Sequence, residues 1–437
     1  MNNTKLIIGL GLTGTSCAAF LKKKSIPFII FDTRPKTEVD DRYIENEAEN
    51  IFFENIMKKD LINVDEAIIS PGLDKSHKVF KILKDLNINI ITDIDLFKRS
   101  NSIPIISITG TNGKTTIVNM LQHVLNNIGI NSIACGNNGI SPLLIPSSQY
   151  KYIILELSSY QLDYMHDYTS YISLISNIDQ DHTDRHKSIE QYISAKKKIY
   201  KSTKYCLANI SLKENRINLS DINTISYYGI NSKSECIIYD NNYKNINISN
   251  SKISYNNLSL DYLGKHNLEN ILAVLSILNI INIELDDSLA AFKDFLYPSH
   301  RIELIKETNG IQWFNDSKST NCASTIAALD AMKNNTILIL GGSKKNISYS
   351  KLSKNINNKV KLLIYIGENK NYIKNQLKVD VRSIDASTMQ DAVQIAIKYA
   401  VRGDSILLSP ASPSYDMYKN YQIRGKDFKN AIEKYVI

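Results

Sequence analysis

Length, composition and charge exclude several classes of protein. The chain has 437 residues, of which 43% are hydrophobic and 22% charged, and its formal net charge is +8. These values predict a soluble globular protein with two to four domains. No stretch approaches 18 apolar residues, so we expect no membrane span, and the short apolar start lacks the form of a signal peptide. The charge would suit a polyanionic partner, but the scattered lysines favour a coding bias, and we expect no nucleic acid partner.

The cysteines indicate a reducing compartment. Their number is odd and no two have C-x-x-C spacing, so neither a disulfide framework nor a zinc knuckle is expected. We therefore predict a cytoplasmic protein. The five residues are Cys17, Cys135, Cys206, Cys236 and Cys322.

Predicted strands and helices alternate along the chain, which indicates α/β domains with mostly parallel sheets. Boundaries near Asp93 and Pro298 predict domains at residues 1–93, 94–298 and 299–437. Between Ile222 and Leu260 an Asn- and Ser-rich pattern predicts a small antiparallel section or a surface excursion. The expected strands are Leu6–Ile8, Phe28–Phe31, Ala67–Ile69, Ile105–Ile108, Tyr152–Leu155, Ile172–Ile175, Ile311–Phe314, Thr336–Leu340, Leu362–Ile366 and Ser405–Leu408. The expected helices are Ser16–Lys23, Lys114–Asn127, Ser188–Tyr200, Leu268–Leu278, Ala323–Met332, Met389–Tyr399 and Asp427–Tyr435.

A phosphate-binding loop is predicted between the strand at Ile105 and the helix that follows it. In such a loop, backbone N–H groups face a phosphate chain, the lysine adds positive charge, and a hydroxyl can bind magnesium. The usual spacing would require glycine at position 108, where Ile108 stands, so a turn without a ligand is the alternative. A simple turn would not require Lys114 followed by two threonines. The loop is Gly110-Thr111-Asn112-Gly113-Lys114-Thr115-Thr116.

A second glycine pattern follows the first predicted strand. Gly9, Gly11 and Gly14 have G-x-G-x-x-G spacing, and Asp32 ends the next strand. Glycines let the backbone approach a diphosphate, and an acid at that strand end can hold a ribose. The pattern predicts a ligand with a diphosphate but does not indicate hydride transfer.

Charged side chains follow the later strands. Glu156 ends a predicted strand beyond the phosphate loop, where a carboxylate can hold magnesium or lie as a solvated charge. The segment from Asn177 to His186 concentrates acids and histidines, which fits a divalent ion near the nucleotide or a polar loop with capping residues. Lys196, followed by two further lysines, has the composition of a solvated helix face.

Six motifs in chain order resemble the Mur ligase family and span nearly the whole sequence. They are Thr109–Thr116, Glu156–Gln161, Asp181-His182-x-Asp184-Arg185, Gly264–Asn267, Ser299-His300-Arg301 and Asn315–Asn321. The resemblance implies three α/β domains. A Rossmann-like N-terminal domain would bind a uridine nucleotide, a central domain like the P-loop ATPases would have a mostly parallel sheet, and a Rossmann-like C-terminal domain would bring the amino acid.

The two ends of the chain resemble the family members that add D-glutamate. The matching residues are Gly9–Gly14, Asp32–Arg34 and Ser70–Gly72 at one end and Ser409–Gly425 at the other. The resemblance implies a monomer that ligates D-glutamate to UDP-N-acetylmuramoyl-L-alanine through an acyl phosphate, in cytoplasmic peptidoglycan synthesis. ATP would be the co-substrate, with two Mg²⁺ ions, for which Mn²⁺ could substitute. Phosphorylation supplies a better leaving group than oxide, and positioned cations stabilise the charge that develops.

The resemblance also assigns roles residue by residue. For ATP it implies Gly110, Thr111, Asn112, Gly113, Lys114, Thr115, Thr116, Asn270, Arg301 and Asp316; for the UDP substrate Leu12, Thr13, Asp32, Thr33, Arg34, Ser70, Gly72, Asn137, Ser158 and Ser159; for D-glutamate Thr320, Lys345, Ser414 and Tyr421. Lys114, His182, Lys196 and Lys318 would be catalytic, and Thr115, Glu156, His182 and Lys196 would serve the metal. Lys196 would be carbamylated by carbon dioxide, since an ammonium cannot ligate a cation whereas a carbamate presents anionic oxygens.

Three other functions stay open from the sequence. A nicotinamide-dependent oxidoreductase would explain the first glycine pattern but not Lys114. A transport or mechanical ATPase conflicts with the irregular glycine spacing of the phosphate loop. A sister ligase, which adds L-alanine or extends folate with glutamate, is separated only by the residues around Ser414.

Overall fold

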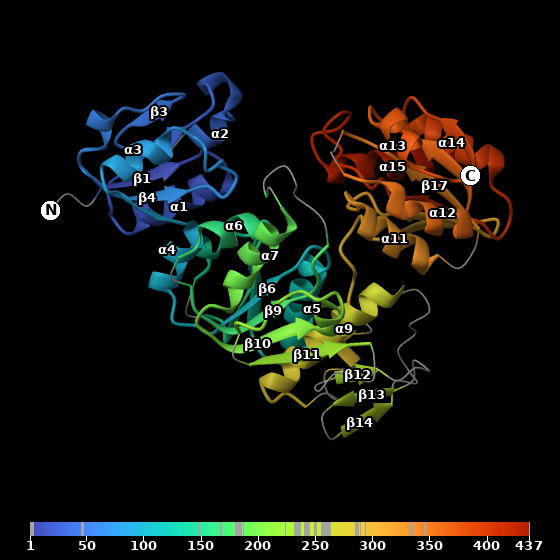
Figure 1. Ribbon diagram of the computed structural model, residues 1–437, viewed down its shortest axis with the longest axis horizontal. Coiled ribbons are helices and arrows are strands. Elements are labelled where there is room, and N and C mark those ends of the chain that lie inside the picture. Colours follow the sequence, from blue (N-terminus) through green and yellow to red (C-terminus); the bar gives the residue numbers. More distant parts are fainter. Residues whose placement is uncertain are drawn as a thin grey trace. The chain divides into compact units, whose positions relative to one another are not determined.

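Three sheets organise the chain (Figure 1). The structure is a computed structural model, which describes residues 4–44, 48–146, 149–166, 168–179, 186, 188–222, 224–230, 237–239, 245–248, 251–254, 264–284, 288, 290–292, 294–332, 335–344 and 347–436. The chain divides into two compact units, the first with residues 1–178, 185–254 and 272–293 and the second with residues 179–184, 255–271 and 294–437. Among the described residues, no helix is both long enough and apolar enough to cross a bilayer.

The first sheet has five parallel strands in the order β3-β2-β1-β4-β5. Strand order reverses between β1 and β4, which is the point where open α/β sheets bind ligands. The predicted strands here are confirmed, while the three-residue β3 and β5 were not predicted because they are too short to show a period. The elements are β1 (Thr4–Ile8), α1 (Leu12–Lys23), β2 (Phe28–Asp32), β3 (Ile51–Phe53), β4 (Val64–Ile69), α3 (Val79–Asp85), β5 (Asn89–Ile91) and α4 (Asp93–Ser100).

The central sheet has the order β14-β13-β12-β11-β10-β9-β6-β8-β7. Strands β6 to β12 pair in parallel, whereas β13 pairs antiparallel with both of its neighbours, β12 and β14. The predicted antiparallel section was therefore only partly right, because β11 and β12 continue the parallel sheet. The strands are β6 (Ile105–Thr109), β7 (Ser132–Gly136), β8 (Tyr152–Glu156), β9 (Ser170–Ile175), β10 (Thr203–Asn209), β11 (Ile225–Gly229), β12 (Ile237–Tyr239), β13 (Asn245–Ile248) and β14 (Ser251–Ser254). The helices include α5 (Lys114–Asn127), α6 (Ser159–Tyr164), α7 (Ile189–Lys197), α8 (Ile210–Glu214) and α9 (Gly264–Ile280).

The third sheet has the order β15-β16-β20-β17-β18-β19, with β15 antiparallel to an otherwise parallel sheet. Its strands are β15 (Glu303–Thr308), β16 (Ile311–Asn315), β17 (Thr336–Leu340), β18 (Val360–Tyr365), β19 (Arg382–Asp385) and β20 (Ser405–Leu408). One hydrophobic cluster joins it to α11 (Cys322–Ala331), α12 (Ser353–Lys359) and α13 (Lys370–Gln376), and another joins it to α14 (Met389–Tyr399) and α15 (Tyr421–Tyr435). The last helix begins at Tyr421 and not at the predicted Asp427, because the Asn420 side chain caps it by accepting a hydrogen bond from Ile423 N.

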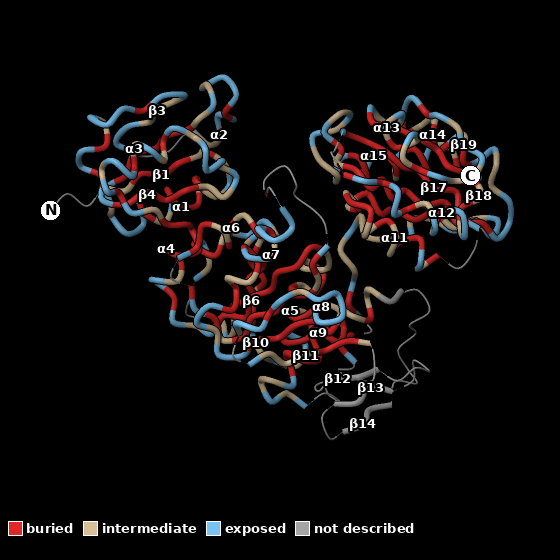
Figure 2. Tube along the Cα trace, viewed as in Figure 1, coloured by how far each residue is buried: buried red, intermediate tan, exposed pale blue. Residues whose placement is uncertain are grey.

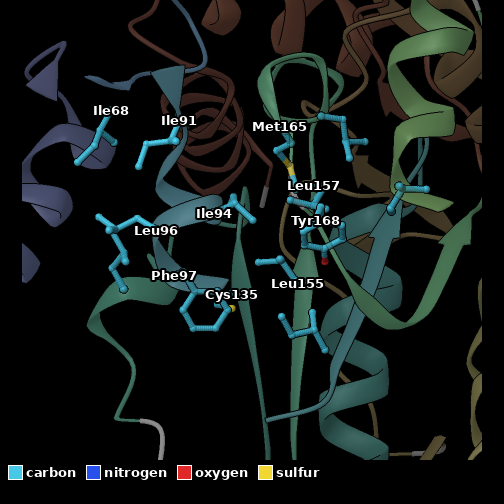
Figure 3. Close-up of a cluster of buried hydrophobic side chains, with 14 of the residues drawn as sticks. Ile68, Ile91, Ile94, Leu96, Phe97, Cys135, Leu155, Leu157, Met165 and Tyr168 are labelled. Atoms are coloured by element: carbon cyan, nitrogen blue, oxygen red, sulfur yellow. The ribbon is translucent and has the colours of Figure 1, made fainter. Parts of the chain in front are cut away.

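Buried aliphatic strands form the cores, as the red segments of β1, β6 and β17 show (Figure 2). One cluster continues through the segment predicted as a domain boundary. In Figure 3, Ile94 and Phe97 of α4 belong to the same cluster as Cys135 of β7 and Leu155 of β8. Helix α4 therefore packs as core and is not an exposed linker.

A buried carboxyl group lies at the start of this helix. Asp93 is 4% exposed, and its Oδ1 atom has no hydrogen-bond partner among the described residues. Burial raises the pKa of Asp93 to about 7; backbone N–H groups at Asp93 and Ile94 oppose the rise, and the charge of Asp95 adds to it. A carboxyl group with an ordinary pKa near 4 in the unfolded chain therefore keeps its proton in the folded protein over a wider pH range.

We predict that Asp93→Asn makes the protein less sensitive to pH. The folded protein retains a proton that the unfolded chain releases, so the wild type should lose up to about 4 kcal/mol of stability as the pH rises from about 4 to about 7. Urea unfolding at pH 5 and pH 8 should show the variant gaining on the wild type at the higher pH. Asp65→Asn, at an exposed carboxylate bonded to Lys5, is the control. An equal difference at both pH values would contradict the expectation.

Candidate active site

The predicted phosphate loop lies between β6 and α5, in a tightly folded conformation. Gly113 adopts a left-handed conformation with φ of 83° and caps α5, which begins at Lys114. The Lys114 ammonium donates hydrogen bonds to the carbonyl oxygens of Gly110 and Thr111, both at 2.9 Å. The positive charge and the helix N-terminus therefore face the same loop, as an anion site requires.

Two residues that follow the neighbouring strand β9 form hydrogen bonds to the backbone of the loop. Asn177 accepts a hydrogen bond from Asn112 N at 2.8 Å and donates one to Asn112 O at 3.0 Å, while Ser176 Oγ also donates to that oxygen at 2.9 Å. A Cβ atom at Gly110 would lie only 2.0 Å from Ser176 Oγ. The position of the first glycine in this loop therefore follows from the close approach of Ser176.

Lys196 lies beneath the same loop and is 1% exposed. Its Nζ atom donates to Gly110 O at 2.8 Å and to Thr109 Oγ1 at 3.3 Å, and lies 4.6 Å from the centre of the Tyr192 ring. The interpretation of Lys196 as part of a solvated helix face was therefore wrong. The sequence held the missing signal: Tyr192, Ala195 and Ile199 recur at helical spacing and place Lys196 on the buried face of α7.

Glu156 ends β8 beside the loop, because the sheet register pairs Ile108 with Glu156. The side chain is 1% exposed, so the alternative of a solvated strand-end charge was wrong. Its Oε1 atom accepts a hydrogen bond from Asn137 Nδ2 at 2.8 Å, whereas Oε2 is buried without a partner among the described residues. A buried carboxylate oxygen without a donor is suited to a cation or an ordered water.

A magnesium ion fits this chemistry. Glu156 supplies a carboxylate oxygen without a partner among the described residues, and Thr115 lies in the first turn of α5, where its hydroxyl is a hard oxygen of the kind that magnesium binds. In the described part of the chain, no three His, Cys, Asp or Glu side chains gather into a metal site. Magnesium usually completes its coordination with oxygens of phosphates and water.

The segment from Asp181 to Arg185, with the predicted ligand His182, lies outside the described residues. The neighbouring His186 is described and is 5% exposed. Its Nε2 atom lies 3.1 Å from Ser159 Oγ, and its ring lies 5.3 Å from that of Tyr192. The Tyr192 hydroxyl is in turn 3.0 Å from Thr111 Oγ1. Ser159, predicted to touch the UDP substrate, is thus linked to the phosphate loop through His186, which lies in the segment noted for its histidines, and through Tyr192, which the sequence did not point to.

The predicted uridine-nucleotide residues meet at the edge of the first sheet where β1, β2 and β4 end. Asp32 is buried, and it accepts hydrogen bonds from Leu10 N at 2.6 Å and from Arg34 N and Nε at 2.9 Å. Burial raises its pKa, but the Arg34 and Leu10 hydrogen bonds outweigh burial and lower it overall. The carboxylate therefore orients Arg34 and the glycine loop, and direct contact with a ribose stays a prediction. The residues Leu12, Thr13, Thr33, Ser70 and Gly72 lie around it, all partly or fully exposed.

The second unit brings together the predicted residues that follow β16. Asp316 is buried and accepts hydrogen bonds from Ile302 N at 3.3 Å, Ser409 Oγ at 2.7 Å and the Ser319 hydroxyl. Burial raises the pKa of Asp316 to about 7, although these hydroxyls and the charge of Arg301 oppose the rise. The Lys318 ammonium lies 5.3 Å from the centre of the Tyr421 ring.

The remaining predicted positions of this unit are only partly brought together. Asn270 is buried on α9 and donates to Asn267 Oδ1 at 3.3 Å. Ser414 is 3% exposed and Thr320 is half-buried, and both lie in loops that follow parallel strands of the third sheet. Lys345 lies outside the described residues.

We predict that Gly110→Ala weakens ADP binding roughly tenfold, because the added Cβ atom would displace the loop from Ser176. Calorimetric titration with ADP would measure this. The double variant Gly110→Ala/Ser176→Gly removes the clashing hydroxymethyl group and should regain part of the affinity, with Ser176→Gly alone as the matched control. Wild-type affinity in Gly110→Ala would show that the close approach does not constrain the loop.

Comparisons with known proteins match all three parts of the chain. Family models described as "Mur ligase MurD-like, N-terminal domain", "Mur ligase middle domain" and "Mur ligase, glutamate ligase domain" match residues 3–92, 108–278 and 300–412. A UDP-N-acetylmuramoylalanine–D-glutamate ligase of Coxiella burnetii (strain CbuK_Q154) is 32% identical over 433 residues, which cover 98% of each chain. The protein of the same name from Buchnera aphidicola subsp. Baizongia pistaciae is 33% identical over 446 residues, covering 99% of this chain and 98% of the relative.

A solved structure shares the fold. The MurF ligase of Thermotoga maritima, in complex with ADP, has a TM-score of 0.64 at 14% identity and covers 93% of this chain and 95% of that one. Together with the full-length relatives above 30% identity, the ordered motifs and the three matched segments lead to one conclusion: this chain belongs to the Mur ligase family.

Proposed function

We propose that the chain is the ATP-dependent ligase that joins D-glutamate to UDP-N-acetylmuramoyl-L-alanine. The main support for this proposal is the group of buried side chains at one edge of the central sheet. There the phosphate loop, the unpartnered oxygen of Glu156 and the Lys196 ammonium gather within one compact unit. Relatives that carry this activity in their names match almost the full chain, which favours D-glutamate over another amino acid.

The reaction requires a carboxylate to become an electrophile. The substrate carboxylate takes the γ-phosphoryl group of ATP to give an acyl phosphate; the D-glutamate amine then attacks the carbonyl carbon, and phosphate leaves from the tetrahedral intermediate. Little covalent chemistry falls to the protein, so its contribution is positioning and stabilisation of charge. The hydrogen bonds that the Lys114 ammonium donates to two carbonyl oxygens of the phosphate loop support this role for it.

The metal-binding residues of this proposal are Thr115, Glu156, His182 and a carbamate on Lys196. Bound magnesium would neutralise phosphate charge and polarise phosphoryl oxygens. The burial of Lys196 against the loop supports its assignment, since a carbamate there would present its oxygens near the nucleotide. Carbon dioxide reacts with the uncharged form of a lysine amine, so the carbamate would form from the neutral Lys196 side chain.

We assign residues 1–93 to the uridine nucleotide, 94–298 to ATP and 299–437 to D-glutamate, in a cytoplasmic monomer. Asp32 and Arg34 support the first assignment, because together they fix the loop at the strand-order reversal. Lys318 and Tyr421 support the third, because they lie close together above the third sheet. The residues Asn137, Ser158, Asn270, Arg301, Thr320, Lys345 and Ser414 complete the proposed contacts.

Phosphate release from ATP tests the proposed function. With UDP-N-acetylmuramoyl-L-alanine present, release should need D-glutamate and should not be supported by L-alanine, L-glutamate or a diamino acid. Lys114→Ala should lose turnover by at least about 10²-fold, since one positioned charge contributes that much to such transition states, while keeping the wild-type melting temperature. Phosphate release that is indifferent to D-glutamate would refute the assignment.

The carbamate has a matched test in two adjacent lysines. Lys196→Arg keeps the positive charge but cannot become a carbamate, so we expect turnover to fall by at least about 10²-fold. Lys197→Arg should stay active, because the Lys197 ammonium lies 2.5 Å from Asp221 and donates to Asn218 O, away from the loop. Thermal unfolding of both variants is the control for folding. A fully active Lys196→Arg protein would rule out the carbamate.

A further inference from the structure

One buried cation in the second unit has no role in the proposed mechanism. Arg424 lies in the first turn of α15 and is only 2% exposed. Its side chain donates four hydrogen bonds, to Ser317 Oγ at 3.0 Å, Ser317 O at 2.8 Å, Ser412 O at 3.0 Å and Pro413 O at 3.2 Å. All of these acceptors are carbonyl or hydroxyl oxygens.

These acceptors belong to the two loops that hold proposed substrate residues. Ser317 lies directly before Lys318 in the loop after β16, which also contains Thr320. Ser412 and Pro413 lie directly before Ser414 in the loop after β20. The Ser317 hydroxyl also donates to Tyr421 O at 2.8 Å, which joins the first loop to the start of α15.

The loop after β17 meets the same guanidinium. Ser343 N donates to Pro413 O at 2.9 Å, so this oxygen accepts hydrogen bonds both from that loop and from Arg424. A Cβ atom at Gly342 would lie 2.2 Å from Pro413 O and 3.0 Å from Arg424 Nη1. The loop therefore packs directly on the guanidinium through Gly342, which lies three residues before Lys345 in the sequence.

A residue with only a structural role at this position would not need to be an arginine. Burial of a cation is unfavourable, and the charges of Asp416 and Asp316 offset only part of this cost, since Arg424 forms no ion pair among the described residues. An apolar residue of similar volume would fill the space with less cost to stability. Burial lowers the pKa of Arg424 to about 10, so the guanidinium still carries its charge at neutral pH. Its planar fork of donors can bond three backbone carbonyls and a hydroxyl at fixed angles, which neither lysine nor an apolar residue can do.

We propose that Arg424 is the positioning residue of the amino-acid site, holding the loops after β16, β17 and β20 in the arrangement that binds D-glutamate. This inference rests on the proposed function. Arg424 acts through Lys318, Ser414 and Tyr421 and does not touch the substrate itself. A residue that fixes three loops at once controls the separation of the groups they present, and a misplacement of about 1 Å is enough to weaken binding and turnover strongly.

The test compares Arg424→Lys with Arg382→Lys in the full-length enzyme. Arg382 is an exposed arginine of the same sheet, which stacks on Tyr399 and lies away from the three loops. For Arg424→Lys we expect the KM for D-glutamate to rise about tenfold or more, with the KM values for ATP and the UDP substrate within about twofold of wild type. Arg382→Lys should leave all three unchanged.

Two further variants keep the inference testable if the lysine variant is unstable. Ser317→Ala removes one hydroxyl acceptor and keeps the carbonyl acceptor, so it should raise the KM for D-glutamate by a smaller factor. Arg424→Ala should be partly rescued by sub-denaturing guanidinium chloride but not by sodium chloride at equal ionic strength. Rescue of the D-glutamate KM would indicate that the guanidinium positions the site, since a lost fold would not respond to it.

The outcomes separate the two proposals. A wild-type enzyme that does not use D-glutamate would overturn both of them. A wild-type enzyme that does, together with an unchanged D-glutamate KM in Arg424→Lys and Arg424→Ala, would overturn the positioning role alone. An equal rise in all three KM values, in step with a lower melting temperature, would likewise reduce Arg424 to a structural residue.

Discussion

The phosphate loop depends on the parallel pairing of β6 with β8 and β9. Parallel strands end at the same edge of a sheet, so the loop after β6, Glu156 after β8 and Asn177 after β9 are placed side by side. Asn177 then fixes the backbone of Asn112, and Ser176 leaves room only for glycine at position 110. A short loop has few internal contacts, and its shape here comes from the neighbouring strand.

Ionisable groups buried at this edge make the candidate site costly to fold. Glu156 and Lys196 are each 1% exposed, and the Glu156 Oε2 atom has no partner among the described residues. Burial of ionisable groups without full compensation lowers stability, and such groups concentrate at functional sites. Asp316 in the second unit follows the same rule, since its carboxyl is buried and three hydrogen bonds only partly compensate.

The loops of the third sheet are held by a different kind of contact from the loop of the central sheet. These loops also leave the ends of parallel strands, but a single guanidinium from α15 connects them, where the central sheet relies on backbone and amide contacts from the next strand. A planar cation with five donors can bond several carbonyls at once, which suits a site built from three separate loops. In the central unit, the Lys114 ammonium donates to the carbonyl oxygens of Gly110 and Thr111 in its own loop.

The sequence by itself determined the strands and helices with clear periods, the phosphate loop, and the family through motifs in fixed order. It could do so because strand and helix periods and glycine positions are local properties of the chain. The short strands β3 and β5, the capped start of α15 and the continuation of the parallel sheet through β11 and β12 were decided by tertiary contacts. So were the contacts of Arg424. The burial of Lys196 lies between the two cases, because composition indicated solvent whereas the helical spacing of its apolar neighbours indicates a buried face. A side chain's surroundings depend on which elements pack against it, and these come from positions as far apart in the chain as Ser317 and Arg424.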